Sequence, residues 1–385
     1  MRIRLVTLLV AVGLLIPPVL AWAATPAPIA TGPFEPLKPN AQETRIAHEV
    51  VKQLQAHHYN HIDLDASFSR KLLNFYLNNL DGSHSVFLAS EVNQFRSRYG
   101  GALSRDLKQG DLWPAFTIYN TYEERRILID KWLLKTLSQS KKGSGLNLSS
   151  QQTFNTDREH APWPKNEKAQ EALWTKRLEN RAIELRLKGL KRAEVRHRLM
   201  QRYREELNQI RQDKSMDAFM AFMDAYTHSY DPHTDYFSPE RSENFKIDMR
   251  LSLQGIGAEM RSKNDYAEIV RLVPGGPAAK SGQLQPADRI VAVGQGPKGK
   301  LTDVVGMRLD KVVQLIRGPA GSTVRLEVMQ PDSNSTHIVT LTREHIQLKD
   351  QAASKHVIDI DRNGKHYKIG VVTLPSFYIH AARDV

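Results

Sequence analysis

Cysteine is absent from the 385 residues of this chain. Its absence excludes disulfides, thiolate nucleophiles, Cys-based zinc or iron–sulfur sites and a lipoprotein-type anchor. The chain also contains neither a Gly-x-Ser-x-Gly elbow nor a His-Glu-x-x-His pair, the signatures of two large hydrolase groups. We therefore expect no metal and no cofactor, and we assign no catalytic residue from these motifs.

Long apolar runs are missing as well, except at the N-terminus. There, Arg2 and Arg4 precede an apolar run over 5–16, and Ala21-Trp22-Ala23 supplies small residues at a cleavage site. This order predicts a secretory signal peptide over 1–23, cleaved after Ala23, and hence a periplasmic protein that meets the membrane only peripherally. The run is too short to span a bilayer, although an uncleaved anchor is the alternative.

Acidic residues are scarce relative to basic ones, which gives a formal net charge of +12. The segment 174–214 holds 13 Lys or Arg against 6 Asp or Glu, so more than half of the excess lies there. Basic helices can bind nucleic acid. Because Glu179, Glu184 and Glu194 are interleaved with the arginines, local ion pairs on solvated helices explain the pattern better, and we expect no nucleic-acid partner.

The N-terminal half has the periodicity of helices. Residues 24–41 are rich in Pro, Thr and Ala and predict a disordered leader. Beyond it, apolar residues at spacings of three and four predict helices near 42–57, 68–80, 111–139 and 163–211, the last divided at Gly189. We expect a helical domain over 42–246.

Three segments could carry chemistry, but each has a plainer interpretation. His57, His58 and His61 lack a carboxylate that would complete a metal site, so capping or surface roles are favoured. The segment 231–235 holds two aspartates and a histidine that could ligate a metal or transfer protons, yet it follows an apolar helix and predicts a turn. The segment 294–301 resembles a phosphate-binding loop whose Ser/Thr position is Leu301, so a β-turn is favoured.

The stretch 251–326 specifies a binding site. Short alternating strands with Gly and Pro punctuation surround one amphipathic helix at 309–316, which predicts a small β-domain. Gly255-Ile256-Gly257-Ala258 could turn several N–H groups toward the carboxylate of a peptide that adds as a strand. The expected groove residues are Met260 on the strand side and Leu309, Val312, Val313 and Ile316 on the helix side, the helix residues being core side chains in the alternative interpretation.

These residues resemble a bacterial PDZ domain. The four residues 255–258 stand where such domains carry a Gly-Leu-Gly-Phe-like loop, and the run from Gly276-Pro277-Ala278 to Asp288-Arg289-Ile290 is also similar. Two positions depart from the pattern. Ala287 replaces a glycine, which puts a turn in question, and Ala258 replaces a large apolar residue, which alters the pocket. A β-domain in which Gly-Ile-Gly is merely a tight turn is the alternative.

Together with Asp231-Pro232-His233-Thr234, the PDZ-like stretch resembles the tail-specific, or carboxy-terminal processing, protease family. The resemblance implies an α+β multidomain protein: an α-helical N-terminal domain, a small PDZ-like β-domain with a short helix over 247–331, and the start of a mixed α/β protease core over 332–385.

The family's enzymes are serine endopeptidases in which a Lys activates the Ser. No residue here matches that pair, so we expect the chain to be inactive alone. The implied partners are the C-terminal tails of protein substrates, with an adaptor or lipoprotein as a further partner of the helical domain. A non-catalytic tail-binding adaptor is the alternative function, and a basic nucleic-acid or envelope binder is a weaker one.

Overall fold

The structure, a computed structural model, describes residues 34–139, 148, 153–331, 333, 335–348, 351–379 and 381. The predicted signal peptide and residues 24–33 lie outside this part. At the end of the predicted leader, the Leu37 N–H donates to Asn120 Oδ1 over 2.8 Å, and the Leu37 carbonyl accepts from Asn120 Nδ2 over 2.9 Å. The disorder expected for 24–41 therefore does not extend to Leu37, because an asparagine satisfies both of its backbone groups.

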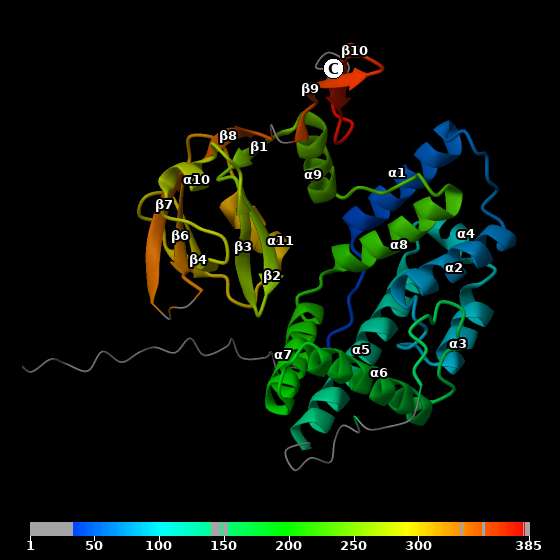
Figure 1. Cartoon of the computed structure of the whole chain (residues 1–385). Helices are drawn as coiled ribbons and strands as arrows, with labels where there is room; N and C mark the ends of the chain where they lie inside the picture. Colours follow the sequence, from blue (N-terminus) through cyan, green and yellow to red (C-terminus); the bar gives the residue numbers. More distant parts are fainter. Residues whose placement is uncertain are drawn as a thin grey trace, which may run out of the picture.

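Helices build the first domain of the described chain, on the right of Figure 1. The first begins with a capping box between Asn40 and Glu43. The helices are α1 (Ala41–His57), α2 (Ala66–Leu80), α3 (Ala89–Tyr99), α4 (Leu103–Lys108), α5 (Trp113–Gln139), α6 (Glu167–Leu187), α7 (Arg192–Ile210), α8 (Ser215–Tyr230) and α9 (Pro239–Arg250). The predicted interruption at Gly189 is confirmed: its φ of 90° lies in the left-handed region between α6 and α7.

Two apolar cores hold these helices together. The larger lies between α1, α2, α4, the first half of α5 and α8, and its fully buried members include Tyr76 and Phe222, whose rings meet edge to face. The smaller joins the second half of α5 to α6 and α7 through Leu133, Leu178 and Tyr203. Leu178, Leu199 and Tyr203 of the basic segment 174–214 pack in this smaller core, whereas Leu187 is 82% exposed.

The second domain is an antiparallel sheet in the order β2-β3-β4-β6-β7, with β5 paired to β4. Helix α11 covers it, and its bounds match the predicted helix 309–316. The elements are β2 (Ala258–Lys263), β3 (Tyr266–Leu272), α10 (Pro277–Ser281), β4 (Arg289–Gln295), β5 (Leu301–Asp303), α11 (Leu309–Ile316), β6 (Thr323–Met329) and β7 (Thr336–Thr342). The segment 294–301 turns from β4 to β5, so it is a β-turn.

The sheet extends past the boundary expected at residue 331. Strand β7 pairs with β6 along its whole length, and Val339 and Leu341 are buried in the same core as β4. A short ribbon of β1 (Ser252–Gly255) and β8 (Glu344–Gln347) follows. Strand β7 lies within 332–385, the range expected for the protease core, yet it belongs to the second domain because it pairs with β6.

A separate hairpin ends the described chain, consisting of β9 (Ser354–Arg362) and β10 (Lys365–Thr373) (Figure 1). Asn363 and Gly364 form its turn with φ values of 55° and 71°, as their sequence predicts. Ile358 pairs with Ile369 and Ile360 with Tyr367, so one face of the hairpin is apolar and exposed. Among the described residues, no helix is both long and apolar enough to pass through a bilayer.

Candidate functional site

The loop between β1 and β2 presents free backbone donors. The Ile256 carbonyl accepts from the Ala278 N–H over 2.9 Å, and the Gly257 carbonyl accepts from the Val273 N–H over 2.8 Å. In the part of the chain that the structure describes, the N–H groups of Ile256 and Gly257 donate to no acceptor. The loop is therefore anchored through its carbonyl groups, while two adjacent N–H groups are left for an anionic ligand.

Gly257 is required by both its conformation and its surroundings. Its φ of 72° lies in the left-handed region. A Cβ at this position would lie 3.1 Å from Cδ1 of Ile346 and 3.4 Å from both Cβ of Val273 and Cα of Gly276. The close approach of Gly276 also explains why the Gly-Pro-Ala run begins with glycine.

Strand β2 lies on the strand side of the expected groove. It lies at the end of the strand order and pairs only with β3 among the described strands, so its outer edge can hydrogen-bond with an extended peptide. Ala258 and Met260 are partly buried and pack against the core of the domain. A strand added here would begin beside the two free N–H groups.

Helix α11 lies on the other side, and its predicted groove residues divide into two kinds. Val312 and Ile316 are almost completely buried and belong to the core. Leu309 and Val313 are only partly buried, with Leu309 also packed against the core. Of the four expected helix-side residues, Leu309 and Val313 are therefore the two that keep part of their surface exposed.

Arg343 closes the C-terminal end of α11, a role that sequence reasoning missed. Its side chain is 2% exposed, and it donates from Nε to the Ile316 carbonyl over 2.7 Å and from Nη2 to the Leu315 carbonyl over 3.1 Å. A cation at this place complements the negative end of the helix dipole. Burial lowers the pKa of Arg343. No spacing or motif marks this residue, since it follows β7 almost thirty residues after the helix.

Basic side chains also gather beside the loop. The Arg317 side chain flanks Gly255, since a Cβ placed there would lie 3.9 Å from Cγ of Arg317. A pocket of about 360 Å³ between α9, β1 and the residues after α11 is lined by Lys246, Arg250 and Arg317, with Glu243 as its acidic member. The charge around this end of the groove thus favours an anion.

The segment after α8 is a turn that ties α8 to the end of α1. Tyr59 Oη donates to Asp231 Oδ2 over 2.5 Å, and His58 Nε2 lies 3.0 Å from Thr234 Oγ1. The hydrogen bond from Tyr59 and that from the His233 N–H lower the pKa of Asp231. Within the described residues, no three potential metal ligands come together. These contacts are those of a structural turn.

A helical domain joined to a PDZ domain with a free strand edge and free loop donors defines a class of peptide-binding proteins. The comparisons make this class specific. Residues 50–240 match the family described as "Tail specific protease N-terminal domain", and residues 244–329 match "PDZ domain". The chain therefore consists of a tail-specific protease N-terminal domain followed by a PDZ domain.

Individual proteins are similar to parts of this chain. A "Tail-specific protease" of Haemophilus influenzae is 36% identical over 346 residues, which are 90% of this chain and 48% of that protein. A "Probable CtpA-like serine protease" of Staphylococcus aureus is 32% identical over 38% of this chain and 26% of its own length. A solved PDZ domain of a carboxy-terminal protease from Vibrio cholerae, in complex with peptide, is 52% identical over 26% of this chain and 100% of that chain, with a TM-score of 0.25. The chain spans about half the length of the Haemophilus relative.

Proposed function

We propose that this chain is the substrate-recognising portion of a periplasmic tail-specific serine endopeptidase, exported by a signal peptide over 1–23. In this proposal the groove between β2 and α11 binds the C-terminal tails of protein substrates. Ile256, Gly257 and Ala258, with Gly255 before them, receive the terminal carboxylate. The observation that carries the proposal is the pair of unpartnered N–H groups at Ile256 and Gly257 beside the free edge of β2.

Cleavage requires residues that this chain does not offer. No residue matches the Ser/Lys pair of the family, and we assign no catalytic residue to the 385 positions. The expected start of the protease core, 332–385, includes β7, which belongs to the PDZ sheet. The hairpin β9–β10 in the rest of that range is our candidate for the first strands of the protease core. Its exposed apolar face supports this proposal, because such a face is stable when further structure covers it.

Peptides that end in a free carboxylate or an amide test the recognition step. The purified chain is titrated with fluorescent peptides that end in Ala, Val or Leu, in both forms. We expect amidation to weaken binding by more than about 1.5 kcal/mol, since hydrogen bonds to a charged acceptor are lost. Equal affinity for acid and amide forms would refute the assignment of the loop.

A cleavage assay with the same peptides separates the protease portion from the alternative, a stand-alone adaptor. We expect no cleavage by residues 1–385 alone. Restoration of cleavage by an added Ser/Lys-bearing protease segment favours the protease. Tail binding without any such restoration favours the adaptor.

A further inference from the structure

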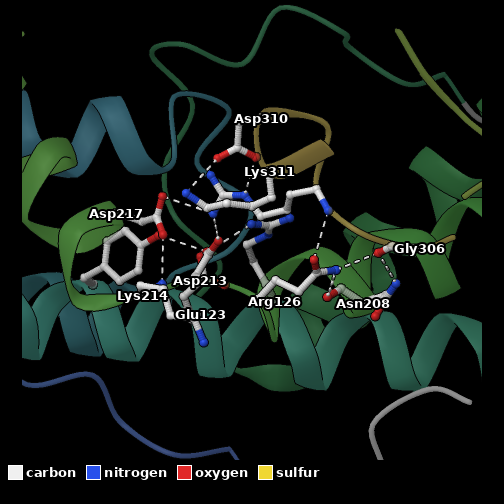
Figure 2. Close-up of polar contacts among 12 residues, drawn as sticks. Glu123, Arg126, Asn208, Asp213, Lys214, Asp217, Gly306, Asp310 and Lys311 are labelled. Atoms are coloured by element: carbon white, nitrogen blue, oxygen red, sulfur yellow. Dashed lines mark hydrogen bonds and ion pairs between the residues drawn. The ribbon is translucent and has the colours of Figure 1, made fainter. Parts of the chain in front are cut away.

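The N-terminal end of α11 is held by the helical domain through backbone groups. The Gly306 carbonyl accepts from Asn208 Nδ2 over 2.9 Å and from Gln212 Nε2 over 2.8 Å. The Arg308 N–H donates to Gln212 Oε1 over 2.9 Å. Asn208 lies on α7 and Gln212 just after it, so the residues that lead into the groove helix are bonded to another domain (Figure 2).

The Arg308 side chain adds charge to this contact. Its Nη1 lies 2.9 Å from Asp213 Oδ1 and 3.0 Å from Asp217 Oδ1, both of the helical domain, and its Nε lies 3.2 Å from Asp310 Oδ1 (Figure 2). The side chains of Arg308, Asp213 and Asp217 are only 24%, 18% and 17% exposed, so water screens them incompletely. Burial acts to lower the pKa of Arg308, but the surrounding carboxylates raise it.

The acidic side of the contact depends on the arginine. Burial and the neighbouring Asp217 carboxylate raise the pKa of Asp213, although Tyr119 and Arg308 act in the opposite direction. Two carboxylates held this close repel each other, and Arg308 is the cation that lies between them. Its loss would leave Arg126 as the remaining cation that lowers the pKa of Asp213, and would weaken the contact at this end of α11, where the backbone hydrogen bonds to Asn208 and Gln212 remain.

The C-terminal end of α11 also contacts the helical region. Gln314 Nε2 donates to Glu240 Oε2 over 2.8 Å, and Arg317 Nη1 donates to Asn244 Oδ1 over 2.7 Å, both acceptors on α9. By contrast, the other groove wall, β2, is held by the sheet. Helix α11 is thus held both by the core of its own domain and by the helical region, whereas β2 has no such hydrogen bond to the helical region among the described residues.

We infer that Arg308 is a positioning residue for tail recognition: through Asp213 and Asp217, the helical domain holds α11 at the distance from β2 that a bound tail requires. This inference rests on the proposed function, since the tail must bind between these walls. A helix already held in place need not be ordered by the ligand, so the contact raises affinity without touching the peptide. Because coupling is reciprocal, a bound tail must also stabilise the contact between the domains.

Tail-peptide binding to the whole chain and its variants tests the inference. We expect the Kd to rise about 5- to 20-fold in Arg308→Met, in line with the usual size of coupling between sites. Arg308→Lys keeps the charge, so its affinity should lie between those of Arg308→Met and the wild type. The isosteric Asp213→Asn lies outside the PDZ domain and should raise the Kd about 2- to 5-fold. Lys311→Met is the matched control. It removes a cation from α11 whose side chain, within the described part of the chain, pairs with Asp310 alone, so the Kd should change less than about 2-fold.

Hydrogen exchange provides the reciprocal measurement. Saturating tail peptide should slow amide exchange over 211–217 in the wild type but not in Arg308→Met. If the wild type binds no tail, the proposed function fails. If the wild type binds tails while Arg308→Met and Asp213→Asn bind equally well, the proposed function stands and the positioning role is overturned. Should Arg308→Met prove unfolded by circular dichroism, Asp213→Asn and the exchange measurement decide the question.

Discussion

Replacement of Gly257 by alanine puts the carboxylate loop under a defined strain. An alanine in the left-handed region costs about 1–2 kcal/mol, and the reduced entropy of the unfolded chain offsets about 0.4–1 kcal/mol of that cost. The new methyl group would lie 3.1 Å from Cδ1 of Ile346, the end of a side chain that can shift by a few tenths of an ångström. We expect a net loss of up to about 1.6 kcal/mol in the free energy of unfolding.

The effect on tail binding should be larger than the effect on stability. A backbone that relaxes from φ 72° rotates the Ile256 and Gly257 N–H groups together relative to β2, so at least one charge-assisted hydrogen bond to the tail is lost. Such a bond contributes about 1.5–3 kcal/mol, which corresponds to a rise in Kd of about tenfold or more. Urea denaturation measures the first quantity, and fluorescence anisotropy with a labelled tail peptide measures the second.

Gly296→Ala is the matched control for Gly257→Ala. Gly296 has a φ of 70° but no neighbouring atom within 4 Å of a Cβ, and it lies in the turn after β4. It should lose about as much stability from backbone strain and bind tails with an unchanged Kd. The reasoning is refuted if both variants bind tails equally, or if Gly257→Ala binds as the wild type does while being destabilised as expected.

Two further predictions concern stability. Ala287 has a φ of 72° although it has a side chain, so Ala287→Gly should relieve strain and raise the free energy of unfolding by about 0.5–1 kcal/mol; a lower urea midpoint would contradict this. Burial, aided by Asp213 and Asp217 and opposed by Arg126, raises the pKa of Glu123 from 4.5 to about 7, so the folded chain binds its proton more tightly than the unfolded chain does. The protonated Glu123 side chain therefore stabilises the folded chain below pH 4.5. This stabilisation, at most about 3 kcal/mol, is lost as the pH rises from 4.5 to 7. Glu123→Gln cannot titrate, and urea midpoints between pH 4.5 and 8 should fall less steeply than in the wild type; an unchanged slope would show that Glu123 does not carry the effect.

Local features of the chain were readable from the sequence because short-range chemistry determines them. The bounds of α11 follow from its apolar spacing, and the turn of the last hairpin follows from Asn363-Gly364, which readily adopts positive φ values. The glycines of the carboxylate loop were recognised for the same reason. The departure at Ala287 did not abolish its turn, because the Asp288 N–H still donates to the Gln285 carbonyl over 3.2 Å.

The pairing of strands that lie far apart in the sequence could not be predicted, and this pairing determines how far the PDZ sheet extends. Strand β7 alternates like any half-buried strand, so its sequence is compatible with either neighbouring domain until it is seen paired with β6. The division of the helix residues into core (Val312, Ile316) and groove (Leu309, Val313) likewise depends on which face the rest of the fold covers.

The sequence by itself determined the helical first half and the position of the PDZ domain, because periodicity and glycine positions are properties of neighbouring residues. Only the tertiary structure brought Arg343 to one end of α11 and Asp213 and Asp217 to the other. These residues lie about 30 and 90 positions from the helix ends that they hold, so no local pattern connects them. The partner of a charged side chain depends on which element lies beside it in the fold, and that position depends on how both domains pack.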